Sequence, residues 1–234
     1  MEKIKEEVPE KLRIAVLLSF ISGYINAFTY NNAGELFAGA QTGNVIFMAL
    51  HFAKGNLEKA VEFLIPIISF MIGQIFIYCF RNFFQRRGHK GYIHSSLLML
   101  FIMIMLIVFL PFFDYHFIVV TLAFFAAIQS DTFQRLRGFS YATIMMTGNV
   151  KNAPRLLIEG LIQRDRELLV RGFLLFLIIF SFMLGVGIST YFTQFVKKSA
   201  LVPLILPLSY INYVLFKEEH NVIDVVKSKI RKIK

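Results

Sequence analysis

The chain has 234 residues, of which 56% are hydrophobic and 17% are charged, and its mean hydropathy is +0.62. A soluble domain carries charge on roughly a quarter of its residues, so this composition excludes an ordinary soluble enzyme. The formal net charge is +10. The basic residues stand at the ends of apolar runs and form no patch with interleaved polar aromatics, which argues against nucleic-acid binding.

Apolar runs long enough to cross a membrane recur along the chain. A helix needs roughly 20 residues to span a hydrocarbon core of about 30 Å. Such runs lie at 12–30, 57–80, 94–113, 117–133, 168–195 and 201–216. They predict an all-α fold, a polytopic transmembrane bundle with about six full spans, whose first partner is the lipid bilayer.

The ends of the chain are charged. The segment 1–11 leads directly into the first apolar run without a small-residue cleavage site, so it predicts a retained cytoplasmic segment and not a removed signal peptide. A single transmembrane domain, 12–216, is then followed by a basic cytoplasmic tail, 217–234. The single cysteine, Cys79, is interpreted as a small core residue.

Two Thr-Gly-Asn triplets interrupt the apolar pattern, one at Thr42-Gly43-Asn44 and the other at Thr147-Gly148-Asn149. The apolar segment after the first triplet, 45–53, is too short to cross a bilayer as a helix. The segment after the second is short and more polar and runs to about Ile162. These features predict two short broken or re-entrant helices.

The two triplets belong to an internal repeat. Asn26, Gly34 and the first triplet line up with Ser130 (or Asp131), Gly138 and the second triplet, with one residue inserted. The shared order and spacing predict repeat one at about 12–80 and repeat two at about 117–195. The run 94–113 connects them, and 201–216 is the final span.

Charge indicates how the repeats are oriented. Placing the basic loop 81–90, the stretch 164–171 and the C-terminal tail inside leaves Asp114-Tyr115-His116 outside. Each triplet segment must then return to its own side, so the repeats are inverted. Lys197 and Lys198 lie outside in this arrangement, against the rule.

The triplets suit the start of a half-helix, where backbone N–H groups are unpaired. Thr42 or Thr147 is predicted to cap with its hydroxyl, Gly43 or Gly148 allows close approach, and Asn44 or Asn149 offers a donor and an acceptor. Two such ends meeting near the midplane would form a polar site. The alternative is that both triplets only cap helices and pack against the opposite repeat.

Four polar residues, Asn26, Gln129, Ser130 and Asp131, lie within apolar runs and must face the bundle interior. Asp131 suggests a proton or cation role, but an ion pair with Arg135, four residues on, explains it equally well. His51 has no second ligand at metal-binding spacing. No catalytic motif is found, so neither an enzyme nor a cofactor is expected.

The stretches LLSFISGYINAFTY…LFAGAQTGNVIFMAL and AAIQSDTFQRLRG…YATIMMTGNVKNAPRLL resemble the YoaK-like family of bacterial membrane proteins, a domain of unknown function. The resemblance runs from about Leu12 to Phe216 and is most specific at Gly23, Asn26 and the first triplet. The family more often carries Asp where this chain has Asn26. The resemblance implies a multi-pass protein of the bacterial plasma membrane with six to seven spans. It does not supply an activity.

The sequence leaves two possible functions open. The first is a transporter or channel for a small polar solute or ion, whose path passes the two triplets. The second is a non-transporting scaffold or lipid-interacting protein, for which glycines such as Gly185 and Gly187 would face lipid. Both allow a homo-oligomer, and both expect cytoplasmic termini.

Overall fold

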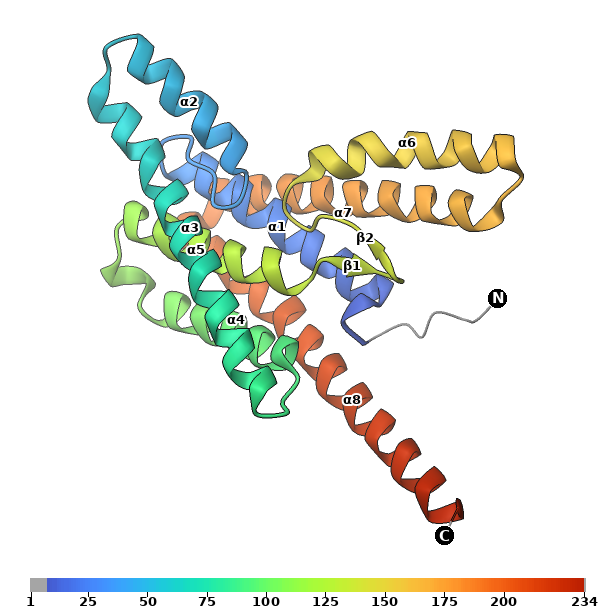
Figure 1. Cartoon of the computed structure of the whole chain (residues 1–234). Coiled ribbons are helices and arrows are strands. Elements are labelled where there is room, and N and C mark those ends of the chain that lie inside the picture. The colour runs from blue at the N-terminus through green and yellow to red at the C-terminus, as the bar shows by residue number, and fades with distance from the viewer. Residues whose placement is uncertain (1–7, 234) are drawn as a thin grey trace.

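A computed structural model describes residues 8–233, with side chains described for 8–219. Its helices are α1 (Leu12–Asn32), α2 (Gln41–Ala53), α3 (Leu57–Arg86), α4 (Gly91–Val108), α5 (Tyr115–Thr132), α6 (Met146–Gln163), α7 (Arg166–Val196) and α8 (Ile205–Ile233). Three short 3₁₀ helices join them, η1 (Val8–Glu10), η2 (Leu110–Phe112) and η3 (Lys197–Leu204). Figure 1 shows the bundle, with α8 extending from it. The predicted N-terminal segment lies mostly outside the described residues, as do the basic side chains of the tail.

Three of the long helices begin at a side-chain cap. Asn56 accepts a hydrogen bond from the Lys59 backbone N–H at the start of α3. Asp114 and Asp165 accept the equivalent bonds at the starts of α5 and α7. Such caps satisfy N–H groups that the first helical turn leaves without a partner. They explain why these helices start directly after tight turns.

The helices extend further than the apolar runs predict. The expected basic loop 81–90 is helical as far as Arg86, because α3 continues beyond its apolar part. Likewise α8 continues past 216 through charged residues, which are good helix formers. The last predicted span is divided, since 201–204 belong to η3.

A small hairpin was not predicted in this otherwise helical chain. Its strands are β1 (Arg135–Leu136) and β2 (Phe139–Ser140), paired antiparallel. The turn residues Arg137 and Gly138 both have positive φ, 47° and 82°, as a two-residue hairpin turn of the primed type requires. Glu10 fixes this turn, because its backbone oxygen accepts from Arg137 N and its carboxylate accepts from Gly138 N.

Two long helix pairs form the centre of the bundle. Helix α1 packs along α7, and α5 packs along α3. The same hydrogen bond links each pair: Ser181 Oγ donates to the Val16 carbonyl, and Ser69 Oγ donates to the Val120 carbonyl, both at 2.7 Å. A glycine follows one turn after each serine, at Gly185 and Gly73.

These two glycines allow the backbones to touch. A Cβ at Gly185 would lie 2.1 Å from the Phe20 carbonyl oxygen, and one at Gly73 would lie 2.6 Å from the Ala127 Cβ. Gly185 is therefore packed inside the bundle, and its predicted exposure to lipid is wrong. Gly187 fits that prediction better, since a Cβ there meets nothing within 4 Å.

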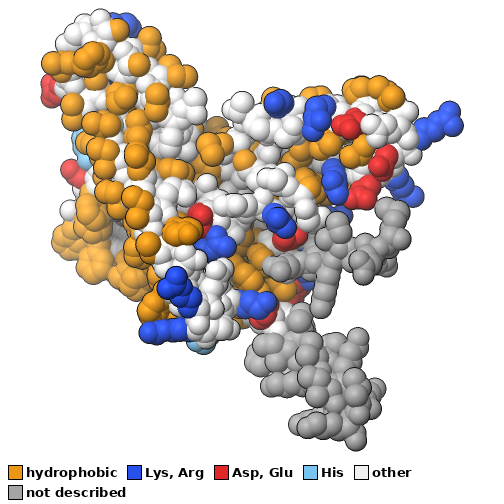
Figure 2. Space-filling model, viewed as in Figure 1, with side chains coloured by type: hydrophobic (Ala, Val, Ile, Leu, Met, Phe, Trp, Pro, Cys, Tyr) orange, Lys and Arg blue, Asp and Glu red, His pale blue; other side chains and the backbone are white. Residues whose placement is uncertain are grey.

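The outer surface of the bundle is apolar. Large exposed side chains cover α3 and α7, among them Met71 (59% exposed), Ile75 (68%), Phe173 (65%) and Phe180 (56%). Cys79 is also exposed, so its interpretation as a core residue is wrong. Figure 2 shows hydrophobic side chains over α2 and α3 and at the left edge, with basic side chains at the right and the bottom.

Four stretches of the described chain are long and apolar enough to cross a membrane: Leu12–Asn32, Leu57–Arg86, Gly91–Val108 and Arg166–Glu219. The last of these contains α7, η3 and the first part of α8. Helix α5 is not among them, and its final turn carries Gln129, Ser130 and Asp131. The protein is therefore an all-α integral membrane protein.

The close approach of α1 and α7 predicts a contrast between two neighbouring glycines. We expect Gly185→Ala to destabilise the protein by about 1–3 kcal/mol, because the added methyl group must force the two helices apart. The matched variant Gly187→Ala should be neutral or slightly stabilising, because it meets open space and alanine favours a helix. Thermal unfolding in detergent measures both, and equal melting temperatures for the two variants would contradict this packing.

Candidate functional site

The asparagines of the two triplets hold the chain that leads into each short helix. Asn44 Oδ1 accepts from Phe37 N at 2.9 Å, and its Nδ2 donates to Phe37 O at 2.8 Å. Asn149 makes the same pair of bonds with Ala142, at 3.1 and 2.7 Å. Both asparagines are buried. Their amides thus bind backbone, and both halves of the chain use the same device.

The threonines of the triplets do not cap the helices. Ala40 and Met145 occupy the N-cap positions, and neither gives a side-chain cap. Thr42 and Thr147 are exposed one step inside the helices. The predicted hydroxyl caps are therefore wrong, because each helix begins earlier than its threonine.

The glycines of the triplets differ from each other. A Cβ at Gly43 would lie 2.8 Å from the Phe37 ring, whereas one at Gly148 meets nothing within 4 Å. Close approach is thus needed in the first triplet only.

Asn26 holds the break between α1 and α2. Its Oδ1 accepts from the backbone N–H groups of Gly39 and Ala40, at 2.9 and 3.0 Å. Thr29 Oγ1 accepts from Ala38 N at 3.1 Å. Buried backbone groups must find partners inside the protein, and α1 supplies them here. Asn26 therefore faces the bundle interior, as predicted for a polar residue in an apolar run.

The two breaks meet at Gly39 and Ile144. A Cβ at Gly39 would lie 2.5 Å from Ile144 Cγ2 and 3.5 Å from the Ala126 Cβ. Gly39 comes just before α2, and Ile144 comes just before α6. Figure 1 shows α2 and α6 beginning near one another and running apart. Two broken segments from distant parts of the sequence are thus in contact inside the bundle.

Gln129 joins α5 to α1. Its Nε2 donates to the Leu18 carbonyl at 3.0 Å and to Ser22 Oγ at 2.7 Å. Its Oε1 is buried without a partner among the described residues. Ser130, next along the helix, is half-buried. Within the part of the chain with described side chains, Thr143 Oγ1, in the segment before α6, is also unpaired. The centre therefore contains polar groups beyond those that the backbone uses.

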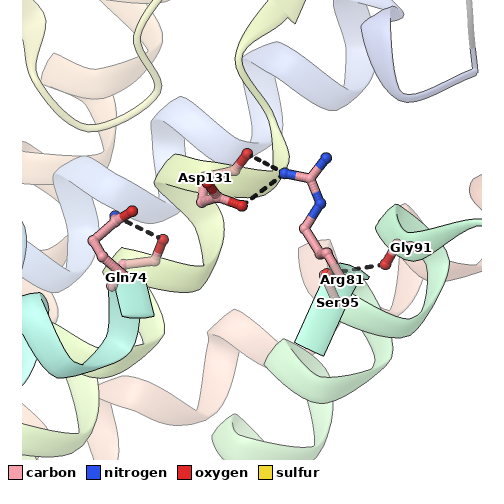
Figure 3. A network of polar contacts seen from close by, with 6 residues as sticks. Gln74, Arg81, Gly91, Ser95 and Asp131 are labelled. Carbon is pink, nitrogen blue, oxygen red and sulfur yellow. Dashed lines mark hydrogen bonds and ion pairs between the residues drawn. The ribbon is translucent and has the colours of Figure 1, made fainter. Parts of the chain in front are cut away.

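Asp131 is paired with Arg81 and not with Arg135. Arg81 Nη1 donates to Asp131 Oδ2 at 2.6 Å and to the Asp131 carbonyl at 2.7 Å. Figure 3 shows the guanidinium of α3 reaching the end of α5. The ion pair with Arg135, one of the two alternatives for Asp131, is not formed, because the helix ends at Thr132 and the chain turns away into β1. Arg81 was missed as a site residue, since its partner lies fifty residues away.

A polar pocket of about 190 Å³ surrounds this ion pair. It lies where the end of α5 meets the last turns of α3 and is also lined by Arg135 of β1; we call it the α3–α5 pocket. Its lining residues are Pro9, Glu10, Arg81, Tyr92, Asp131, Thr132, Phe133, Gln134 and Arg135.

A second polar pocket, of about 460 Å³, lies where the end of α1 meets the end of α7; we call it the α1–α7 pocket. Its lining residues are Asn31, Asn32, Tyr115, Thr190, Thr193, Gln194 and Lys197. A neighbouring cavity of about 410 Å³ shares Asn31 and Thr190 with it and extends to Asn26 and Ala40 at the break before α2. Each pocket thus occupies the same position relative to its own helix pair.

The asparagine bonds predict that Asn149→Leu destabilises the protein more than Thr147→Val. Removing the amide leaves the Ala142 N–H and carbonyl without their partner, which costs about 1–3 kcal/mol. The threonine is exposed, so its replacement should stay within about 0.5 kcal/mol. Thermal unfolding of the purified protein measures both changes. A larger loss from Thr147→Val would restore the capping role.

The comparisons with curated proteins and with solved structures found no match. Residues 14–213 match the family DUF1275, described as a protein of unknown function. The resemblance to the YoaK-like family is consistent with this match. The chain belongs to the DUF1275 family of proteins of unknown function.

Proposed function

We propose that the protein is transporter-like and moves a small polar solute or ion between the α1–α7 pocket and the α3–α5 pocket. The observation that carries the proposal is the contact of two broken segments at Gly39 and Ile144, between polar pockets on two different helix pairs. Broken helices at membrane depth are typical of sites that handle a polar substrate.

The first support is a correspondence between the two halves of the chain. Ser69 and Ser181 make the same bond, and so do Asn44 and Asn149. In each half the first helix packs on the long helix of the other half. We infer two repeats, α1–α4 and α5–α8, so that α4 and α8 correspond and α4 is more than a connection.

The second support is helix length. Helix α2 has 13 residues and is about 20 Å long at 1.5 Å per residue, too short to cross a core of about 30 Å. We propose that α1, α3, α4, α5, α7 and α8 cross the membrane, that α2 returns to the side from which it came, and that α6 does the same because Asn149 binds the chain before it as Asn44 does before α2. The repeats are then inverted, because α1 and α5 start on opposite sides.

Charge supports one orientation. The turn after Arg86 lies in the lower part of Figure 1 and the turn between α6 and α7 at its right, and basic side chains in Figure 2 lie over both, at the lower right end of the bundle. We propose that this end faces the cytoplasm of a bacterial cell. Lys198, which breaks the charge rule, donates to the Phe113 carbonyl and lies over the Tyr115 ring. These contacts offset the cost of its position.

Single-cysteine labelling in a Cys79→Ser background tests the orientation. Lys54, His89, His116 and Gln163 are exposed in turns or at helix ends. We expect cysteines at 54 and 116 to react with a membrane-impermeant maleimide from outside the cell, and those at 89 and 163 to react only after permeabilisation. If 54 and 89 exchanged sides, α2 would cross the membrane and the inverted arrangement would be overturned.

Flux into liposomes tests transport itself. We expect the reconstituted protein to raise the flux of at least one solute in a panel of small ions, acids and polyols. Thr190 lines both the α1–α7 pocket and the neighbouring cavity, so Thr190→Phe fills their junction and should remove most of that flux. Ile188→Phe, on the exposed face of the same helix, is the matched control and should not.

Two results would count against this proposal, the first against transport and the second against the path. One is a flux equal to that of empty liposomes across the whole panel, which would favour the scaffold function. The other is an unchanged flux in Thr190→Phe, which would exclude this path.

A further inference from the structure

We propose that the α3–α5 pocket binds an oxyanion, a carboxylate, phosphate or sulfate group, through Arg81 and Thr132. The inference names a substrate class for this pocket and rests on the proposed function for its meaning, but the binding itself requires no transport. The pocket volume of about 190 Å³ corresponds to roughly six water molecules, which suits one small anion.

Arg81 has donors to spare. Of its five N–H groups, those of Nη1 serve Asp131, whereas Nε is buried and has no partner within the described chain. Figure 3 shows dashed contacts from one terminal nitrogen only, with the other directed away from Asp131. The planar guanidinium fork matches the two oxygens of a carboxylate or phosphate better than an ammonium does.

Thr132 adds a second unpaired group to the same wall. Its Oγ1 is buried and has no partner among the side chains and backbone that the structure describes. A buried polar group without a partner costs free energy, so two of them lining one pocket point to a ligand that pairs with both. Arg135 lines the pocket as well and adds positive charge.

Each acidic residue of the pocket has one carboxylate oxygen that already accepts a hydrogen bond. Asp131 Oδ2 accepts from Arg81, and Glu10 Oε2 accepts from the Gly138 N–H at 2.7 Å. The buried unpaired groups are thus an N–H, which can only donate, and a hydroxyl, which can donate. An oxyanion would accept from both, whereas a cation could not pair with the N–H. This balance of donors over acceptors is the reason for choosing an anion.

Binding is tested with the purified full-length protein in a neutral detergent. Sulfate, inorganic phosphate and acetate are each titrated against chloride at constant ionic strength, and the melting temperature is recorded. A ligand that binds only the folded state raises that temperature with its concentration. We expect at least one oxyanion to do so where chloride does not.

Three variants locate the site. Arg81→Lys keeps the charge but removes the fork, and Thr132→Val removes only the unpaired hydroxyl; each should weaken binding by about tenfold, the effect of one charge-assisted hydrogen bond. Thr143→Val removes another buried, unpaired hydroxyl, which does not line this pocket, and should bind as the wild type does. Thr132→Val relieves an unpaired group, so it tests the site even if Arg81→Lys fails to fold.

Phosphatidylglycerol, added in mixed micelles, separates the two sources of such a group. Stabilisation by this lipid alone, lost in Thr132→Val, would assign the site to a lipid headgroup and support the oxyanion chemistry. Stabilisation by a free ion, lost in the same variant, would assign it to a soluble anion. Binding equal to wild type in both pocket variants, or no response to any oxyanion or to the lipid, would overturn the inference.

Binding and flux fail separately. An anion that binds through Arg81 while no solute crosses liposomes would contradict transport and leave this site standing. Flux without any anion binding would contradict this site and leave transport standing.

Discussion

The structure depends on one constraint: buried backbone that is not helical must be hydrogen-bonded within the protein. Asn26 and Thr29 satisfy three N–H groups of the segment before α2. Asn44 and Asn149 each satisfy one N–H and one carbonyl of the segment before their own helix. Without these bonds the unpaired backbone groups would cost several kcal/mol each in an apolar medium. The polar residues in the apolar runs are thus first of all what makes the breaks stable.

The breaks also require close helix packing, because the long helices must enclose them. Small residues allow this packing, with Gly73 and Gly185 placing one backbone against another and Ser69 and Ser181 bonding across. Asparagine at position 26 suits its place, since Nδ2 donates to the Ser22 carbonyl while Oδ1 accepts twice. An aspartate would keep the accepted bonds and lose the donated one. Asn26, where the YoaK-like family more often carries aspartate, therefore adds one donated hydrogen bond. The accepted bonds that hold the segment before α2 would remain with either residue.

Much of the fold follows from local signals in the sequence. Apolar runs predict the long helices, and the triplets predict both breaks. Both signals are local, because hydropathy and the helix-breaking effect of glycine depend on neighbouring residues. The capping role predicted for the triplet threonines was wrong, because tertiary contacts set an earlier helix start. Ala40 and Met145 therefore occupy the N-cap positions. The pair Arg81–Asp131 was missed because the sequence does not reveal that α3 and α5 are in contact. A further similarity between the two halves of the sequence was present: Ser69-Phe70-Met71-Ile72-Gly73 matches Ser181-Phe182-Met183-Leu184-Gly185 at four of five positions.

The correspondence between the halves makes their differences informative. The contacts that hold the breaks and pair the helices recur in both halves, so they are explained by the fold alone. Charge does not recur in the same way: one pocket contains the Arg81–Asp131 ion pair, whereas the other is lined by Thr193, Gln194 and Lys197. The described residues that line the α1–α7 pocket make no ion pair, so the Arg81–Asp131 pair is not a requirement that both pockets share. The Arg81 guanidinium and the unpaired Thr132 hydroxyl are therefore better explained by a function of the α3–α5 pocket than by the stability of the fold.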